Sequence, residues 1–424
     1  MQHTIPFWLA VLININIVIG AGFFLVVQKI SMANGALAPF AWLLCGLLLL
    51  PFVNAIAQLS QRFPRAGGIY VFSKELLGDM WGMVSGWAYY LGTAAANAAV
   101  GHALAEALMQ FPGIDQLVAR KDISVLWVDF LVVGLFTLLN LRNVDFLEKA
   151  QLLFTSLKAL PILAIVIALP LLFSWQNVMS GSFAPLSLLP TLPKVFFAYI
   201  GIEACCSVMD KIENAQKNAS RLIFISFASI VAIYGLLQLV VLSIHGTADV
   251  DGFLSLPGLL FSNPLVACFA NYAIRLGLLA SFLAGFYGVF YFNNWNLYTM
   301  AKETGIKQVA ALTRLNKNNV PWVSVLVQSA IVFFFLVCMH SDYIIALSDI
   351  GTGIAFVLTT VAFFCWKRSI AALLGIISCC FLLYIFAQDI IAAGLITLIP
   401  ALLMLVGGIV SYWWCKSRCI LASR

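Results

Sequence analysis

Twelve apolar segments, each close to 20 residues or longer, occupy most of this 424-residue chain. A helix needs about 20 apolar residues to cross the roughly 30 Å of hydrocarbon in a bilayer. Because 63% of the residues are hydrophobic and only 9% are charged, a soluble globular fold is excluded. The sequence therefore predicts an all-α integral membrane protein with 12 transmembrane helices, over residues 5–32, 38–59, 81–109, 123–141, 148–173, 191–212, 219–244, 264–301, 321–339, 342–366, 369–387 and 389–414.

The distribution of lysine and arginine predicts the orientation of these helices. The first apolar segment has no basic flank before it and no small-residue cleavage site after it, so we interpret it as a retained span rather than a signal peptide. Cytoplasmic loops carry the excess of basic residues. Here seventeen of the 23 lysines and arginines fall on one side, against Lys29, Arg120 and Lys121 on the other. This predicts an inner cell membrane protein with both termini in the cytoplasm, and no nucleic-acid binding.

Two glycine-containing interruptions fall in the middle of apolar segments. Gly20 and Gly22 interrupt the first segment, and Gly201 precedes a carboxylate in the sixth. Non-helical backbone at membrane depth survives only where protein or a water-filled cavity surrounds it, and a broken helix in each half is typical of an inverted-repeat transporter. Close helix packing is the alternative for either glycine cluster. The pair predicts two halves of opposite orientation and a peripheral part, which are residues 1–174, 175–367 and 368–424.

Three motifs resemble those of the amino acid–polyamine–organocation (APC) transporters, in the same order and along nearly the whole chain. They are Gly20-Ala21-Gly22-Phe23-Phe24, Arg62-Phe63-Pro64-Arg65-Ala66-Gly67-Gly68-Ile69-Tyr70, and Gly201-Ile202-Glu203-Ala204 followed by Ile212-Glu213-Asn214-Ala215-Gln216-Lys217-Asn218. The sixth segment most resembles that of the bacterial arginine/agmatine and putrescine/ornithine antiporters. The resemblance implies a LeuT-like fold, a 5+5 inverted repeat in which helices 1 and 6 are broken.

The same resemblance implies a substrate site at the two breaks. The substrate carboxylate would lie on freed N–H groups of the first break, and the α-ammonium group on carbonyls of both breaks, as expected for helix N-termini and C-termini. An asparagine of the third span would contact the substrate, and two phenylalanines would act as gates. The substrate-binding residues implied in this way are Val18, Ile19, Gly20, Ala21, Gly22, Asn97, Phe197, Ile200, Gly201 and Phe290.

Two ionisable residues inside predicted spans are candidates for proton coupling or gating. An ionisable group within a membrane span is functional by default, and the resemblance implies proton-dependent gating by Glu203. A permanently hydrogen-bonded structural carboxyl is the alternative. Lys158, about 10 residues into the fifth span, resembles a lysine that stands near the first break in other branches of the superfamily, where desolvation could let it load and unload a proton. A lysine that snorkels to the interface is the alternative.

Two further polar positions leave alternatives open. Asp349 lies about two turns into the tenth span, where it could face the substrate and pair with a cationic group. It could instead form an internal ion pair with Arg275, Lys194 or His102. His102 and Glu106, four residues apart near the outer end of the third span, favour a mouth or packing pair over a proton relay.

These patterns favour a secondary active transporter for an amino acid, cationic ones included, or a related amine, driven by proton coupling or by exchange. A neutral amino acid/proton symporter is the nearest alternative. A polytopic membrane enzyme would require a nucleophile–base set or a His/Asp cluster, and a channel would require filter-like repeats, none of which the sequence shows. We therefore predict no enzymatic activity, no cofactor and no metal site. The predicted partners are a small-molecule substrate, protons and the lipid bilayer, for a monomer or homodimer.

Overall fold

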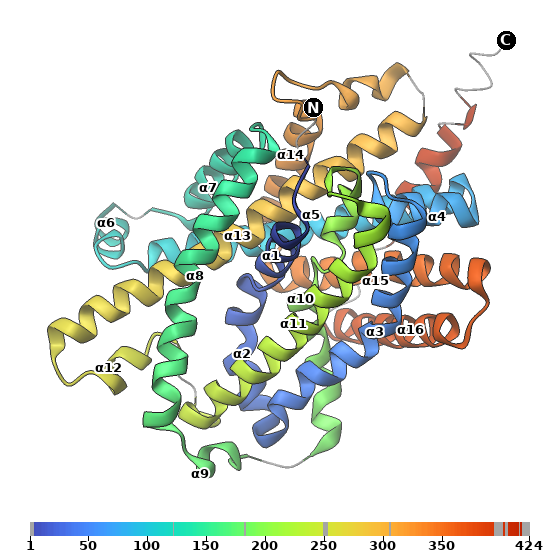
Figure 1. Cartoon of the computed structure of the whole chain (residues 1–424). Helices are drawn as coiled ribbons and strands as arrows, with labels where there is room; N and C mark the ends of the chain where they lie inside the picture. The colour runs from blue at the N-terminus through green and yellow to red at the C-terminus, as the bar shows by residue number, and fades with distance from the viewer. Residues whose placement is uncertain are drawn as a thin grey trace.

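The computed structural model of the protein describes residues 4–121, 123–181, 184–248, 253–304, 307–393, 402, 406–414 and 416–417. Within these residues the chain is all-helical, and its β-type pairing is limited to isolated bridges. Figure 1 shows the long helices packed side by side into one body. Among the described residues, six stretches are long and apolar enough to cross a membrane, which supports the predicted multi-pass membrane protein. They are Gly22–Arg62, Val144–Leu172, Ala215–His245, Pro264–Thr304, Asp342–Lys367 and Ile370–Gln388.

The helices follow the order of the predicted spans, with short helices between them. The α-helices are α1 (Phe7–Val18), α2 (Ala21–Asn34), α3 (Ala38–Arg62), α4 (Gly68–Leu77), α5 (Asp79–Met109), α6 (Ile114–Lys121), α7 (Val125–Asn140), α8 (Val144–Leu172), α9 (Trp175–Val178), α10 (Leu192–Tyr199), α11 (Ala215–His245), α12 (Leu256–Leu260), α13 (Pro264–Thr304), α14 (Trp322–Cys338), α15 (Ser341–Lys367) and α16 (Ile370–Ala393). Short 3-10 helices cover Gly35–Leu37, Pro185–Thr191, Ala204–Ser207, Met209–Lys211 and Lys307–Thr313.

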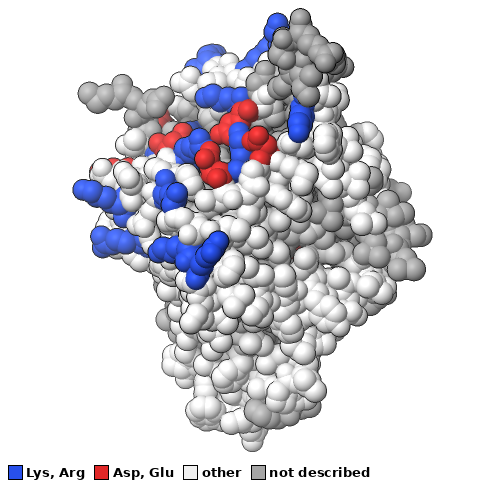
Figure 2. All heavy atoms as spheres, turned by 90° about the vertical axis from the view of Figure 1, so that its right-hand side faces the viewer, with Lys and Arg blue, Asp and Glu red and all other residues white. Residues whose placement is uncertain are grey.

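The surface divides into a charged end and an apolar body. In Figure 2, lysine, arginine and acidic side chains gather toward the upper end of the visible face, and the surface below them is almost entirely uncharged. Ion pairs join α4 to the end of α13, with Lys74 Nζ 2.6 Å from a Glu303 carboxylate oxygen. Large apolar side chains such as Leu131 and Phe269 are exposed on the helices. Such a surface suits hydrocarbon, since water would oppose a continuous apolar patch of this extent.

Helical geometry is interrupted at both predicted places. α1 ends at Val18 and α2 begins at Ala21, so the first apolar segment is two helices rather than one. α10 ends at Tyr199, and the chain then turns through residues 200–203. The sixth span, predicted as 191–212, is α-helical only in this first part, because Gly201 has a φ of +111° that no helix accommodates.

The end of the chain differs from the predicted boundaries. α16 continues to Ala393, past the predicted boundary at residue 388, because neither glycine nor proline occurs between residues 388 and 393 and a polar Gln-Asp pair alone does not end a helix. Residues 394–401 and 403–405 of the twelfth predicted span lie outside the described residues, while 406–414 are helical.

Backbone pairing joins distant segments at the charged end. Ile5 forms a bridge with Ile212, and Ala66 forms one with Val208. The N–H of Gly67 also donates to the Ser207 carbonyl at 3.1 Å. The N-terminal segment, the loop after α3 and the chain after the second interruption are therefore tied to one another beyond the breaks.

Candidate functional site

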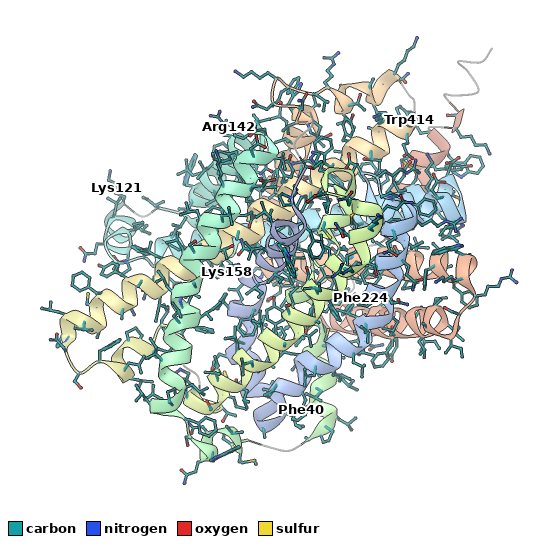
Figure 3. All side chains as sticks on the ribbon, viewed as in Figure 1. Phe40, Lys121, Arg142, Lys158, Phe224 and Trp414 are labelled. Atoms are coloured by element: carbon teal, nitrogen blue, oxygen red, sulfur yellow. The ribbon has the colours of Figure 1, made fainter. Side chains whose placement is uncertain are left out.

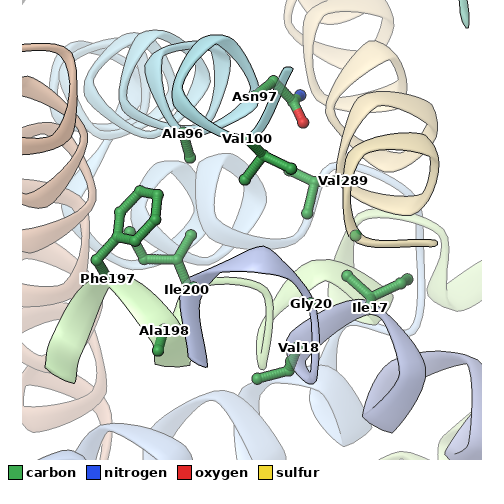
Figure 4. A pocket seen from close by; sticks show the side chains of 12 residues that line it. Ile17, Val18, Gly20, Ala96, Asn97, Val100, Phe197, Ala198, Ile200 and Val289 are labelled. Carbon is green, nitrogen blue, oxygen red and sulfur yellow. The ribbon is translucent and has the colours of Figure 1, made fainter. Parts of the chain in front are cut away.

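A small cavity of about 30 Å³ lies where the two interruptions meet. It has room for about two water molecules, which is less than an amino acid needs. Figure 4 shows the break between α1 and α2 and the end of α10 on one side of it, with α5 and α13 opposite. The lining residues are Ile17, Val18, Gly20, Gly22, Ala96, Asn97, Val100, Phe197, Ala198, Ile200, Gly285 and Val289.

The first break presents the N-terminus of α2 to this cavity. The N–H of Gly20 donates to the Val18 carbonyl at 2.6 Å, which closes a tight turn after α1. No side chain in the described part of the chain caps α2, so the N–H groups of its first turn lack a helical acceptor and favour an anion. At Gly22 an added Cβ would lie 2.7 Å from Ala198 Cα, so glycine allows α2 and α10 to approach. This end of the cavity can therefore receive a carboxylate.

Glu203 lies in the turn of the second break and is fully buried. Its carboxylate accepts hydrogen bonds from the Gly201 N–H, 3.3 Å from each oxygen, and from the Tyr89 hydroxyl at 3.0 Å. These contacts hold the carboxylate against α5, outside the cavity lining. Glu203 therefore connects the shape of the second break to α5, and it can change that connection if it gains a proton.

Tyr234 of α11 joins the two breaks, and the sequence analysis did not select it. Its hydroxyl lies 2.7 Å from the Val18 carbonyl and 2.9 Å from the Ala198 carbonyl, at the ends of α1 and α10. Its ring stacks on Phe23 with centroids 4.9 Å apart. The only indication of Tyr234 in the sequence is that a polar aromatic residue occurs midway along a predicted span. One hydroxyl group thus binds the Val18 carbonyl, which is expected to receive a substrate ammonium, together with the neighbouring Ala198 carbonyl.

Removing that hydroxyl should loosen both breaks. We expect Tyr234→Phe to lower the free energy of unfolding by about 1–3 kcal/mol, because the buried Ala198 carbonyl loses this donor and the Val18 carbonyl keeps only the Gly20 N–H. Thermal unfolding of the purified protein in detergent measures the change. Tyr287→Phe is the matched control, because its hydroxyl donates to a single carbonyl, that of Leu139, at 3.2 Å. Equal losses in the two variants would contradict a special role for Tyr234.

Lys158 stands beside the first break, midway along α8 (Figure 3). Its side chain is buried, and its ammonium group donates to the Asn16 carbonyl at 2.8 Å and to the Ile19 carbonyl. Ser281 of α13 donates to the same Ile19 carbonyl at 2.9 Å. These carbonyls end α1, where the helix dipole favours a cation. Lys158 therefore occupies a cation position at the break and does not reach an interface.

Asn97 lines the cavity from α5 and is almost fully buried. Its amide nitrogen has no hydrogen-bond acceptor within the described part of the chain. Phe197 and Ile200 line the cavity from the opposite side, at the end of α10 (Figure 4). Because buried polar groups are normally paired, the Asn97 amide is available to a bound ligand.

The structure does not bring every predicted residue to the cavity. The lining contains Val289 in place of Phe290, whose ring packs 5.6 Å from that of Phe286. Asp349, Gly201 and Ile19 are not among the lining residues. The Ile19 carbonyl instead accepts hydrogen bonds from Lys158 and Ser281. Of Ala21 only the backbone is described.

The candidate ion-pair partners of Asp349 have other contacts. His102 Nδ1 lies 3.0 Å from a carboxylate oxygen of Asp129 in α7, and its Nε2 lies 3.5 Å from Glu106. Arg275 donates to Asn271 at 2.8 Å and to the Gln110 carbonyl at 3.2 Å. The His102–Glu106 contact agrees with a packing pair, and Asp129 completes a group that the spacing alone did not reveal.

Comparison with known proteins identifies related sequences. The profile of a family described as "Amino acid permease" matches residues 5–412. The aspartate-proton symporter of Bacillus subtilis is 26% identical over 287 residues, which are 65% of this chain and 54% of the symporter. The arginine/ornithine antiporter of Latilactobacillus sakei is 23% identical over 333 residues, covering 75% and 68% of the two chains. The serine/threonine exchanger SteT of Bacillus subtilis is 22% identical over 375 residues, covering 86% and 82%.

Proposed function

The chain belongs to the amino acid permease family, in agreement with the APC resemblance of its motifs, and on this premise we propose that it is a secondary active transporter of an amino acid. It would work by proton coupling or by exchange, since its relatives are named as a symporter, an antiporter and an exchanger. The named relatives are transporters and not enzymes. The matched region spans only about half the length of the aspartate-proton symporter, so the activity is inferred from the site as well as from the family.

The observation that carries this function is the cavity at the junction of two broken helices. It lies at the N-terminus of α2 and at the C-terminal ends of α1 and α10. An amino acid head group carries a carboxylate and an ammonium, and these two ends match them in charge. We place the carboxylate at Gly20 to Gly22 and the ammonium near the Val18, Phe197 and Ile200 carbonyls.

The two interruptions also support the proposed LeuT-like arrangement. Under it, twelve spans would include two inverted five-helix halves, residues 1–174 and 175–367, with residues 368–424 at the periphery. The uneven distribution of lysine and arginine supports an inner-membrane orientation with both termini in the cytoplasm.

Uptake into proteoliposomes tests the function. The purified protein should take up at least one labelled amino acid or amine from a panel, and a pH gradient or internal substrate should stimulate that uptake. Liposomes without protein give the background. Uptake at background level for the whole panel, by protein that is folded and inserted, would contradict the proposal.

Glu203 is proposed to make transport depend on pH. We expect Glu203→Gln to keep substrate binding and to flatten the pH dependence of transport, because glutamine can accept the same Gly201 and Tyr89 hydrogen bonds but cannot titrate. Transport rates between pH 5 and pH 8 measure the effect. Glu106→Gln is the control, since Glu106 is half-exposed and lies outside the breaks. A wild-type pH profile in Glu203→Gln would make Glu203 structural.

A further inference from the structure

The side-chain wall of the cavity is apolar apart from one amide. Opposite the two breaks it consists of Ala96, Asn97 and Val100 of α5 and Val289 of α13, and Phe197 and Ile200 close the remaining side (Figure 4). No charged side chain is present among the lining residues that the structure describes. A substrate whose head group sits at the breaks would therefore place its side chain against this neutral wall.

The ionisable groups near the breaks form hydrogen bonds with other groups of the protein. Lys158 is bound by the Asn16 and Ile19 carbonyls, and Glu203 is bound by Gly201 and Tyr89. Neither of them lines the cavity. A cationic or acidic side chain in the cavity would lack a counter-charge, and burying an unpaired charge costs several kcal/mol.

The wall opposite the breaks has one polar side chain, Asn97, and two branched ones, Val100 and Val289. The amide nitrogen of Asn97 has no hydrogen-bond acceptor among the described residues, so it can donate to a bound substrate. Val100 and Val289 extend from neighbouring helices and lie together across the cavity from Gly20 (Figure 4). Both side chains line the cavity, which is about 30 Å³ in this conformation, so they bound its space on this side.

Resting on the transport function proposed above, we propose that the substrate is an amino acid with a small, uncharged side chain, and that Val100 and Val289 set its upper size. Alanine and serine represent this class. Serine adds a hydroxyl oxygen that can accept from the Asn97 amide. The names of the relatives do not decide the class, because they include acidic, cationic and neutral amino acids.

Competition in proteoliposomes that contain the full-length protein tests the substrate class. Uptake of tritiated L-alanine should be inhibited by unlabelled serine and threonine, and at least about 100-fold more weakly by arginine and aspartate. Inhibition by arginine or aspartate within about tenfold of alanine would overturn the substrate class while the transport function stands. If every amino acid in the panel gives background uptake, the transport function itself fails and the substrate class fails with it.

Four variants test the residues. Val100→Ala and Val289→Ala should each raise the uptake of leucine relative to that of alanine by about tenfold or more. One methylene in a fitted pocket changes the discrimination between two substrates by about 10–200-fold. Val325→Ala, a buried valine of α14, should leave the ratio unchanged. Asn97→Asp places a carboxylate in the wall and should make arginine a competitor. An unchanged leucine-to-alanine ratio in both valine variants would overturn the size limit, and unchanged arginine exclusion in Asn97→Asp would overturn the assignment of this wall to the substrate side chain.

Discussion

A Gly22→Val protein should insert into the membrane and bind no substrate. An added Cβ at this position would lie 2.7 Å from Ala198 Cα and 3.1 Å from Ala198 Cβ, and neither atom can move without its backbone. Valine would thus force α2 away from α10 and cover the N–H groups at the break. Binding of a labelled amino acid to purified protein, beside size-exclusion chromatography to verify folding, measures the effect.

Two other glycines make this expectation specific. Gly134 of α7 has open space around its Cβ position, so Gly134→Val should bind substrate as wild type does. At Gly20 the nearest atom to an added Cβ is the Ile17 carbonyl oxygen at 3.1 Å, so Gly20→Ala should weaken binding less than Gly22→Ala. Wild-type affinity in Gly22→Val would show that the substrate does not bind at this break.

The breaks were predictable because their signal is local. Glycines inside an apolar segment weaken a membrane helix whatever tertiary contacts surround it. The structure departs from helical geometry at Gly20 and at Gly201. The partners of the breaks depend on tertiary contacts. Tyr234 meets Val18, 216 residues away, and Lys158 meets Asn16, 142 residues away. The position of Lys158 well inside a predicted span indicated that it is buried. That position could not indicate which carbonyls Lys158 binds.

Phe290 illustrates a different limit. The resemblance placed a gate at Phe290, but successive residues of a helix point about 100° apart, so a shift of one position changes the side that faces the cavity. The structure lines the cavity with Val289 and packs Phe290 on Phe286. Residue matching at low identity cannot settle such a shift. Depth alone likewise did not determine the direction of Asp349, which is buried outside the cavity lining.

Lys158→Met should abolish accumulation driven by a pH gradient and retain exchange. The ammonium is the group at the first break whose charge can change, and it lies on the Asn16 and Ile19 carbonyls at the end of α1. Methionine fills a similar path but supplies neither a proton nor a donor. Ser281 would still donate to the Ile19 carbonyl, so the break should keep its shape and the cavity should still bind substrate.

Preloaded vesicles separate the two modes of transport. With substrate inside and no pH gradient, Lys158→Met should exchange at a rate close to wild type, whereas under an inward proton gradient it should fail to concentrate substrate. Lys194→Met, at an exposed lysine early in α10, should behave as wild type in both assays. If Lys158→Met accumulates substrate normally, the lysine serves only to bind the end of α1. If Lys158→Met loses exchange together with accumulation, the role of Lys158 is to hold the first break in shape. The coupling group would then be Glu203, whose hydrogen bonds with Gly201 and Tyr89 link the second break to α5.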